Sequence, residues 1–191
     1  MINKEHYQFI RQHPAFENFP VESFDKLAIE IQFHKVSKGQ IIFFSGDRRD
    51  RLFLLYQGYA RIEQYDATDT FSYTDYIKKG NVFPYGGIFF DERYHYTASA
   101  VTQVEYFSIP MKLFEDFSKK NVNQLLFITQ KLSRILEFQE LRLRNVVAVS
   151  ATDRVVQSLS ILCMDLCKTG DVLPFPISMK ELAQAHSQLP L

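Results

Sequence analysis

The chain has 191 residues, of which 46% are hydrophobic and 23% are charged, and its formal net charge is zero. This length is enough for one or two domains with a buried core, and the composition is that of an ordinary globular protein. The neutral balance argues against a protein that binds polyanions without specificity, although one locally basic helix stays compatible with it.

The cysteines and the N-terminal segment predict neither a metal site nor an export route. Cys163 and Cys167 stand four residues apart and have no further cysteine near them. Two thiols are too few for a disulfide framework or a complete zinc site, so two small apolar residues on a helix face are the simpler interpretation. The start of the chain lacks the pattern of a signal peptide, and no run of about 18 apolar residues occurs. We therefore expect a cytoplasmic protein that has no membrane partner.

The first 32 residues predict short helices. Apolar residues recur here at spacings of three and four, and Pro14 and Pro20 interrupt the pattern. Such a pattern is typical of two or three helices that pack on whatever follows them.

Residues 33–109 have the pattern of short antiparallel strands joined by tight turns. Gly39, Gly46 and Gly58 separate runs of β-branched and aromatic residues, and glycine adopts the backbone angles that such turns need. The expected strands are residues 40–44, 52–56, 60–65, 71–77 and 104–109. Their regular spacing predicts a β-barrel or sandwich. Most of its aromatic residues are expected in the core, and the rest in the wall of a pocket.

A long helix is predicted after Pro110, following a short amphipathic helix over residues 111–119. Residues 121–149 contain neither proline nor glycine. The heptad positions of this segment form one seam: Leu125, Ile128, Leu132, Ile135, Gln139, Arg142, Val146 and Val149. One apolar face can cover the β-region, and the other then needs a partner, most simply the same helix of a second subunit. The alternative is a helix buried on both sides within one chain.

The C-terminal part predicts one more helix and the start of another. Residues 153–168 have a helical pattern, and the segment 169–171 ends it. Ser178 and Glu181 then have the spacing of a capping box, in which the hydroxyl and the carboxylate each accept from a free amide. We expect a helix to start here, with Lys180 in its first turn.

The order of these elements resembles the Crp/Fnr family of bacterial transcription regulators. The resemblance rests on the segment from Gly39 to Gly58, on Lys79-Gly80-Asn81-Val82-Phe83 and on the capped helix start after residue 177. It implies an α+β fold with N-terminal helices, an antiparallel β-roll of the jelly-roll type, a long dimerisation helix and the start of a winged helix-turn-helix. The implied domains are a sensor domain over 1–120, the dimerisation helix over 121–149 and an incomplete DNA-binding domain over 150–191.

The resemblance also implies a function. Members of the family are homodimers that respond to a small-molecule effector, bind promoter DNA and contact RNA polymerase. A weaker likeness is to the family's regulators of arginine catabolism and of virulence. No catalytic arrangement stands out, so we expect no enzyme. The alternative is a dimeric module that binds a small ligand or another protein and does not bind DNA. Ser178, Lys180 and Glu181 would begin the DNA-binding motif.

The residues that hold cyclic AMP in the family are replaced in this chain. The Gly-Glu pair of the family falls on Phe83-Pro84, its Arg-Ser pair falls on Tyr94-His95, and its helix Thr-Ser pair falls on Gln139-Glu140. Without the arginine there is no bidentate cation for the phosphate, and proline offers neither a donor nor a carboxylate. Arg93 is adjacent, but a shift of one residue in a strand points a side chain to the other face. We therefore expect no cyclic AMP.

Other cofactors of the family are also not expected. An iron–sulfur cluster would need an N-terminal group of cysteines, which the chain lacks, and haem would need an axial ligand such as His95. The resemblance leaves a remodelled pocket that takes a small non-nucleotide ligand, such as a peptide or metabolite, or no ligand at all. Its expected lining is Phe83, Tyr85, Gly86, Tyr94, His95, Tyr96 and Gln139.

The expected helix-turn-helix lacks its reading helix within these residues. The second helix of such a motif enters the major groove, and family members carry an arginine there. Residues 184–191 contain no arginine, and Pro190 would break a helix. We therefore expect that these 191 residues do not bind an operator specifically.

Overall fold

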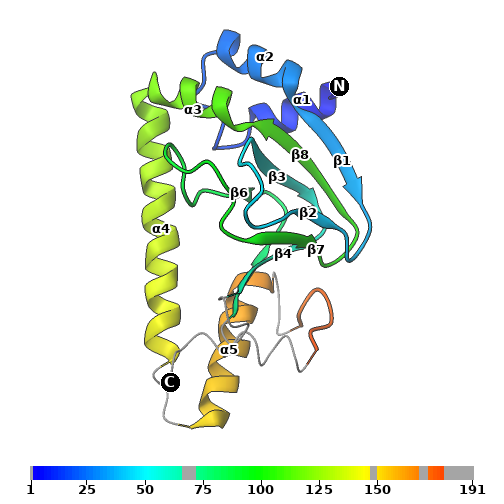
Figure 1. Cartoon of the computed structure of the whole chain (residues 1–191), viewed down its shortest axis with the longest axis vertical. Helices are drawn as coiled ribbons and strands as arrows, with labels where there is room; N and C mark the ends of the chain where they lie inside the picture. The colour runs from blue at the N-terminus through cyan, green and yellow to red at the C-terminus, as the bar shows by residue number, and fades with distance from the viewer. Residues whose placement is uncertain (1, 66–71, 147–149, 168–171, 179–191) are drawn as a thin grey trace.

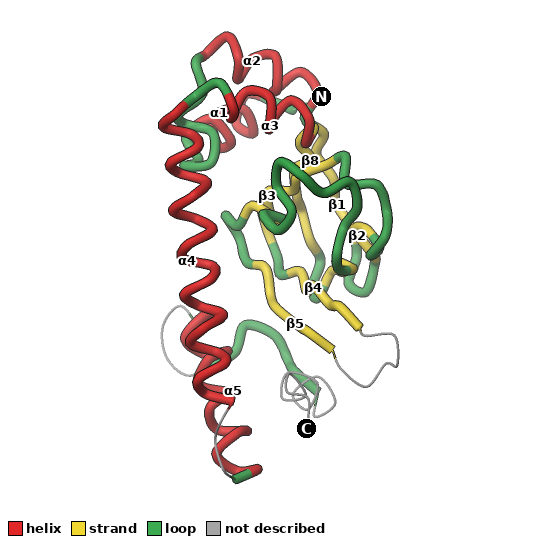
Figure 2. Tube along the Cα trace, turned by 60° about the vertical axis from the view of Figure 1, so that its left-hand side comes forward, coloured by secondary structure: helices red, strands yellow, loops and turns green. Residues whose placement is uncertain are grey.

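The computed structural model describes residues 2–65, 72–146, 150–167 and 172–178. Three short helices lie at one end of a β-roll, a long helix runs along the side of the roll, and a further helix lies near its other end (Figure 1). The tube in Figure 2 shows the same arrangement from another side, with the long helix beside the strands over most of its length.

The three short helices are α1 (Lys4–Arg11), α2 (Val21–Glu30) and α3 (Met111–Lys119). The side chain of Asn3 caps α1 by accepting a hydrogen bond from the His6 amide at 2.8 Å. The apolar faces of the helices pack on the outer face of a β-sheet and form one core with it. This core includes Phe16, Phe19, Phe24, Leu27, Phe107, Ile109 and Phe114. This confirms the N-terminal helices and the short helix after Pro110.

The β-roll consists of two antiparallel sheets of four strands each. In the first, the order is β1 (Gln32–Val36), β8 (Val104–Pro110), β3 (Arg51–Gln57) and β6 (Val82–Phe83). In the second, it is β2 (Ile41–Phe43), β7 (Thr97–Ala100), β4 (Ala60–Tyr65) and β5 (Ser72–Ile77). Strands β1, β6 and β7 were not among the expected runs.

Strand β3 is buried on both faces, which explains its continuous apolar run. Successive side chains of a strand point to opposite faces. Leu52 and Leu54 pack against the helices, whereas Phe53 and Leu55 point into the roll, where they meet residues of the second sheet such as Ile62. The strand therefore joins the two cores.

Gly58 shows why a glycine is needed at a turn of this roll. Its φ is +86°, and a Cβ atom there would lie 2.2 Å from the carbonyl oxygen of Gln103. Gly39 and Gly46 also have positive φ, so the predicted role of the three glycines as turn residues is confirmed.

The two remaining helices follow the β-roll. Helix α4 spans Val122–Val146, and α5 spans Ala151–Leu166. Ser150 caps α5 by accepting from the Asp153 amide at 3.1 Å, as its sequence position suggests. The helix predicted to begin near Ser178 lies outside the described residues, as do Lys180 and Glu181. The division into three domains stays a prediction.

None of the helices in the described ranges combines the length and the apolar character needed to cross a membrane.

Candidate ligand-binding pocket

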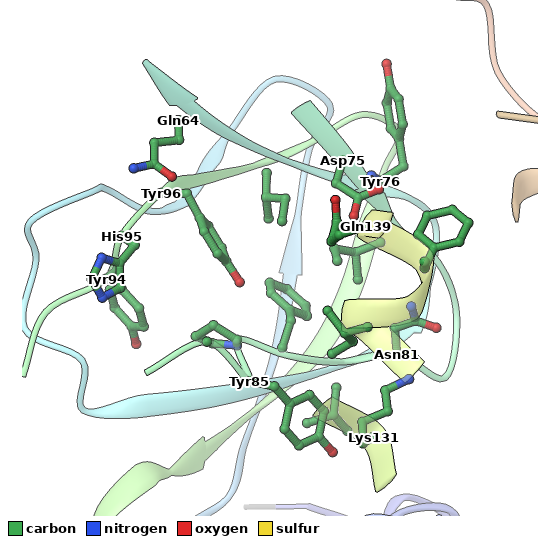
Figure 3. Close-up of a pocket in the computed structure, with 18 of the residues that line it drawn as sticks. Gln64, Asp75, Tyr76, Asn81, Tyr85, Tyr94, His95, Tyr96, Lys131 and Gln139 are labelled. Carbon is green, nitrogen blue, oxygen red and sulfur yellow. Dashed lines mark hydrogen bonds between the residues drawn. The ribbon is translucent and has the colours of Figure 1, made fainter. Parts of the chain in front are cut away.

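A cavity of about 540 Å³ lies between the β-roll and helix α4. Figure 3 shows Tyr94 and His95 on one side of it, Lys131 and Gln139 entering from α4 on the other, and Tyr96 extending toward the middle. All seven residues that the sequence analysis placed in a pocket line this cavity: Phe83, Tyr85, Gly86, Tyr94, His95, Tyr96 and Gln139. That they bind a ligand stays a prediction.

Tyr94, which the resemblance aligns with a phosphate-binding arginine, is built into the wall of the roll. Its ring stacks on Phe43 with a centroid distance of 4.0 Å. Its hydroxyl donates to the Arg51 carbonyl at 2.8 Å and accepts from the Arg51 amide at 3.2 Å. Burial raises the pKa of Tyr94 to about 12. The side chain is therefore neutral, with its hydroxyl already bonded to the backbone.

The neighbours of Tyr94 also provide no phosphate clamp. Nε2 of His95 lies 2.6 Å from a carboxylate oxygen of Asp91, and the His95 side chain is mostly exposed. Arg93 donates to the Gly46 carbonyl at 2.6 Å and is not part of the cavity wall. The Phe83–Pro84 peptide bond in this wall is cis.

Arg49 is a buried cation of the cavity wall that the sequence analysis missed. Its Nη1 donates to the Asp91 carbonyl at 3.2 Å and to Glu115 at 3.1 Å. The same Glu115 oxygen accepts from the Phe89 amide at 2.9 Å. Nε and Nη2 of Arg49 are buried and have no partner among the described residues. Charged residues surround Arg49 in the sequence, and a pattern of that kind normally indicates a solvent-exposed turn.

Helix α4 contributes two further cations to the cavity wall, Lys131 and Arg134. Burial lowers the pKa of the half-buried Lys131, and the nearby charges of Arg134 and Lys78 lower it further. Neither Lys131 nor Arg134 has a hydrogen bond or ion pair within the part of the chain that the structure describes. The α4 side of the cavity is therefore its electropositive side.

Two acidic residues of the cavity wall are held by cations of the same chain. Nη1 of Arg142 lies 3.5 Å from a carboxylate oxygen of Asp75, and Nη2 of Arg142 donates to the Thr74 carbonyl at 3.0 Å. Nζ of Lys78 lies 2.8 Å from a carboxylate oxygen of Asp165 on α5. These contacts fasten α4 and α5 to strand β5 and the residue that follows it.

The seam that the sequence analysis predicted along α4 is divided between two faces. Ile128 is 1% exposed in the helical core, and Arg142 bonds to β5, which corrects their assignment to a contact between subunits. Ile135 and Gln139 line the cavity. A heptad stripe drifts by about 20° per heptad on a straight helix, so one flank of it turns toward the β-roll.

Several leucines of α4 lie on its outer side. Leu126, Leu132 and Leu136 are exposed, and Leu125 is half-buried. The side chain of Val146 and the whole of Val149 lie outside the described residues. The outer face of α4 is defined here by Leu125, Leu132 and Leu136.

The described residues contain no group of three or more His, Cys, Asp or Glu side chains that could hold a metal ion. Cys163 and Cys167 lie at α5 and form no disulfide with each other, and Sγ of Cys167 lies 3.2 Å from the Val172 carbonyl. The absence of cofactors stays a prediction.

Comparison with known proteins finds one matching domain model and two similar regulators. Residues 33–121 match the model of the cyclic nucleotide-binding domain. The global nitrogen regulator of Synechococcus elongatus is 24% identical over 180 residues, which cover 90% of this chain and 81% of that protein. The global nitrogen regulator of a Nostoc species is 26% identical over 156 residues, which cover 78% and 69%. The chain is therefore similar to these two regulators and matches a cyclic nucleotide-binding domain over residues 33–121.

Solved structures agree with this fold. The sensor domain of the transcriptional regulator DNR from Pseudomonas aeruginosa has a TM-score of 0.61 and 22% identity, and the match covers 76% of this chain and 99% of that one. The c-di-GMP responsive global regulator CLP from Xanthomonas campestris has a TM-score of 0.66 and 18% identity, with coverage of 87% and 84%. The predicted α+β fold with a β-roll is confirmed.

Proposed function

We propose that this protein is a homodimeric, effector-sensing transcription regulator that binds promoter DNA. The observation that carries the proposal is the position of the cavity between the β-roll and α4, where a ligand would contact both. Helix α4 leads directly to α5 and the C-terminal segment, in which the sequence predicts a DNA-binding motif. A ligand in this place can therefore influence how that motif is presented.

The outer face of α4 supports the homodimer. Leu132 and Leu136 are exposed on a helix whose neighbouring face is occupied by the cavity and the core. A row of leucines in water is unfavourable, and a second copy of the same helix would cover it with a matching row. Two long helices that pair along such a row form a short coiled coil.

The cavity supports an effector other than cyclic AMP. Its volume of about 540 Å³ is typical of sites for small molecules, and its wall combines aromatic rings with a few polar groups. Tyr94 and His95 replace the cation that a cyclic phosphate needs, and the free cations lie on the α4 side instead. A ligand with a different arrangement of charge therefore fits better.

Selection of DNA sequences tests the proposal. The gene product that carries these residues is incubated with a library of random duplexes at physiological salt, because phosphate contacts depend strongly on salt. We expect enrichment of an inverted repeat, since a two-fold dimer reads two half-sites. The 191-residue chain is tested beside it, and we expect no enrichment with it.

Each result decides one part of the proposal. If the gene product enriches no sequence, DNA binding is wrong and the dimeric binding module is favoured. If the 191-residue chain enriches the same repeat, the prediction that it lacks a reading helix is wrong.

A further inference from the structure

Lys131 and Arg134 form a cationic end of the cavity. They lie three residues apart on α4, so their side chains are neighbours on one face of the helix. Burial lowers the pKa of Lys131, and the nearby charge of Arg134 lowers it further. An anion between them would offset both effects, and no carboxylate among the described residues pairs with either.

Arg49 is a weaker candidate for the anion site. It also lines the cavity, and two of its nitrogen atoms have no partner among the described residues. Its charge, however, is already balanced by Glu115 at 3.1 Å. A buried ion pair offers little net attraction to a further anion. The uncompensated positive charge lies at α4.

Asp165 brings a carboxylate of α5 to the same end of the cavity. It lines the cavity together with Lys131 and Arg134, and it pairs with Lys78 at 2.8 Å. Its charge raises the pKa of Lys131, whereas the charges of Arg134 and Lys78 lower it. The side chains of Lys78 and Asp165 are 37% and 29% exposed, so solvent screens their ion pair, and Nζ of Lys78 also donates to the Asp165 carbonyl.

The docking of α5 uses a second residue of the cavity wall. Leu162 and Leu166 of α5 pack with Phe175 against Tyr76, and the rings of Phe175 and Tyr76 lie 5.2 Å apart. Tyr76 also lines the cavity. Tyr76 and Asp165 therefore have two roles: both line the cavity, and both make contacts that hold α5 against the β-roll.

We propose that Lys131 and Arg134 bind the anionic group of the effector and that its negative charge repels the nearby carboxylate of Asp165, so that binding loosens α5 from the β-roll. The ligand class is a small organic anion with an apolar ring or chain, which would lie against Tyr85 and Phe138 of the same wall. This inference rests on the proposed role of the cavity as the effector site.

The two cysteines of the chain report the state of α5 directly. Cys163 lies within α5, Cys167 caps its C-terminal end, and both are half-buried. Local opening of a helix increases the rate at which its thiols react. The rate of reaction with a maleimide is measured with phenyl phosphate, with benzoate and with the neutral benzyl alcohol. We expect both anions to increase the rate about threefold or more, and benzyl alcohol to leave it unchanged.

Direct binding of the same compounds is measured by calorimetry on matched variants. Lys131→Gln with Arg134→Gln should weaken phenyl phosphate binding about tenfold, since two charged donors are lost. The control variant, Lys112→Gln with Lys120→Gln, removes two exposed cations that do not line the cavity. Its affinity for phenyl phosphate should equal that of the wild type. Asp165→Asn should tighten binding about threefold and should react quickly with maleimide before any ligand is added. Asp116→Asn on α3 is its control.

The possible results separate clearly. Equal binding by the wild type and the Lys131→Gln, Arg134→Gln variant overturns the anion site. Binding without a change in thiol reactivity overturns the coupling to α5. A preference for phenyl phosphate over benzoate assigns the subsite to phosphate, and the reverse preference assigns it to carboxylate. None of these measurements uses DNA, so failure of the DNA selection leaves this inference standing, and failure here leaves the DNA selection unaffected.

Discussion

The guanidinium of Arg49 bonds to the carboxylate of Glu115 at 3.1 Å, and the arginine side chain is 2% exposed. This pair joins the segment before β3 to helix α3, and the Glu115 carboxylate also holds the Phe89 amide at 2.9 Å. One carboxylate of α3 thus holds both the segment before β3 and the loop that forms one side of the cavity.

Loss of this carboxylate should destabilise the protein strongly. Glu115→Ala leaves a buried guanidinium without its counter-charge, and we expect the free energy of unfolding to fall by about 3 kcal/mol. The measurement is urea unfolding followed by circular dichroism. Glu105→Ala removes the partner of the exposed Lys35 and should cost less than about 1 kcal/mol. Equal losses in the two variants would contradict a special role for the buried pair.

The outer face of α4 predicts the effect of charge on assembly. Leu132→Glu with Leu136→Glu would bring like charges together between two copies of the helix, so we expect a monomer with an intact fold. Sedimentation velocity gives the mass, and circular dichroism checks the fold. Ile29→Glu, at an exposed position of α2, should leave the mass unchanged. A double variant that sediments as the wild type does would show that this face is not the contact. Ile128 is unsuitable for this test because it is buried in the core.

Cyclic AMP should not bind. Pro84 has no amide to donate, and the Tyr94 hydroxyl is bonded to the backbone of Arg51. Without a cation at the family's phosphate position, the desolvation of the phosphate has no compensation there. Saturation-transfer NMR with millimolar cyclic AMP should give no signal above that of adenosine. A saturable signal specific to the cyclic nucleotide would disprove the assignment of Tyr94 and His95 to the replaced positions.

His13 should make the protein less stable in acid. Its Nδ1 accepts from the Ala15 amide at 3.1 Å, which leaves Nε2 to donate to the Gly80 carbonyl at 2.8 Å. Burial lowers the pKa of His13 below the ordinary 6.5, although the bond to Gly80 acts in the opposite direction. The unfolded chain therefore binds the proton first as the pH falls, so stability present above pH 6.5 is lost below it.

The pH dependence of His13→Gln tests this assignment. We compare the free energy of unfolding at pH 7.5 and pH 5.5 by urea titration. The wild type should lose more stability on acidification than the variant. Some loss should persist in the variant because desolvation also lowers the pKa of His34. An equal loss in both proteins would mean that His13 is not the group responsible.

Gly39 and Gly58 have nearly equal φ values, +85° and +86°, and therefore offer a matched comparison. Gly39→Ala meets nothing within 4 Å and should cost only the left-handed conformation, about 1–2 kcal/mol. Gly58→Ala meets the Gln103 carbonyl oxygen as well and should cost clearly more. Thermal unfolding measures both variants. Equal midpoints would show that the contact with Gln103 relaxes without cost.

The pocket shows where a register taken from a family resemblance succeeds. The seven predicted residues come from β6, from the segment before β7 and from α4, and no local pattern connects them. The alignment of Phe83-Pro84 and Tyr94-His95 with the family positions placed them together. Arg49 could not be found in this way, because its burial depends on Glu115, which is 66 residues away.

The sequence by itself determined the helices, the turns and the long strands of the roll. These features depend on neighbours in the chain: a glycine at positive φ, a capping serine at α5 and an apolar run in β3 are local requirements. Strands β1, β6 and β7 were not predicted, and pairing with β8, β3 and β4 holds them in place.

Only the tertiary structure decided which face of α4 covers the β-roll. Periodicity shows that the helix has apolar residues on more than one side, but the partner of each side is set by residues far away in sequence. Ile128 faces the helical core and Arg142 bonds to β5, while Leu132 and Leu136 lie outside. The difference arises because burial is a property of the packed chain, whereas a hydrophobic pattern is a property of one segment.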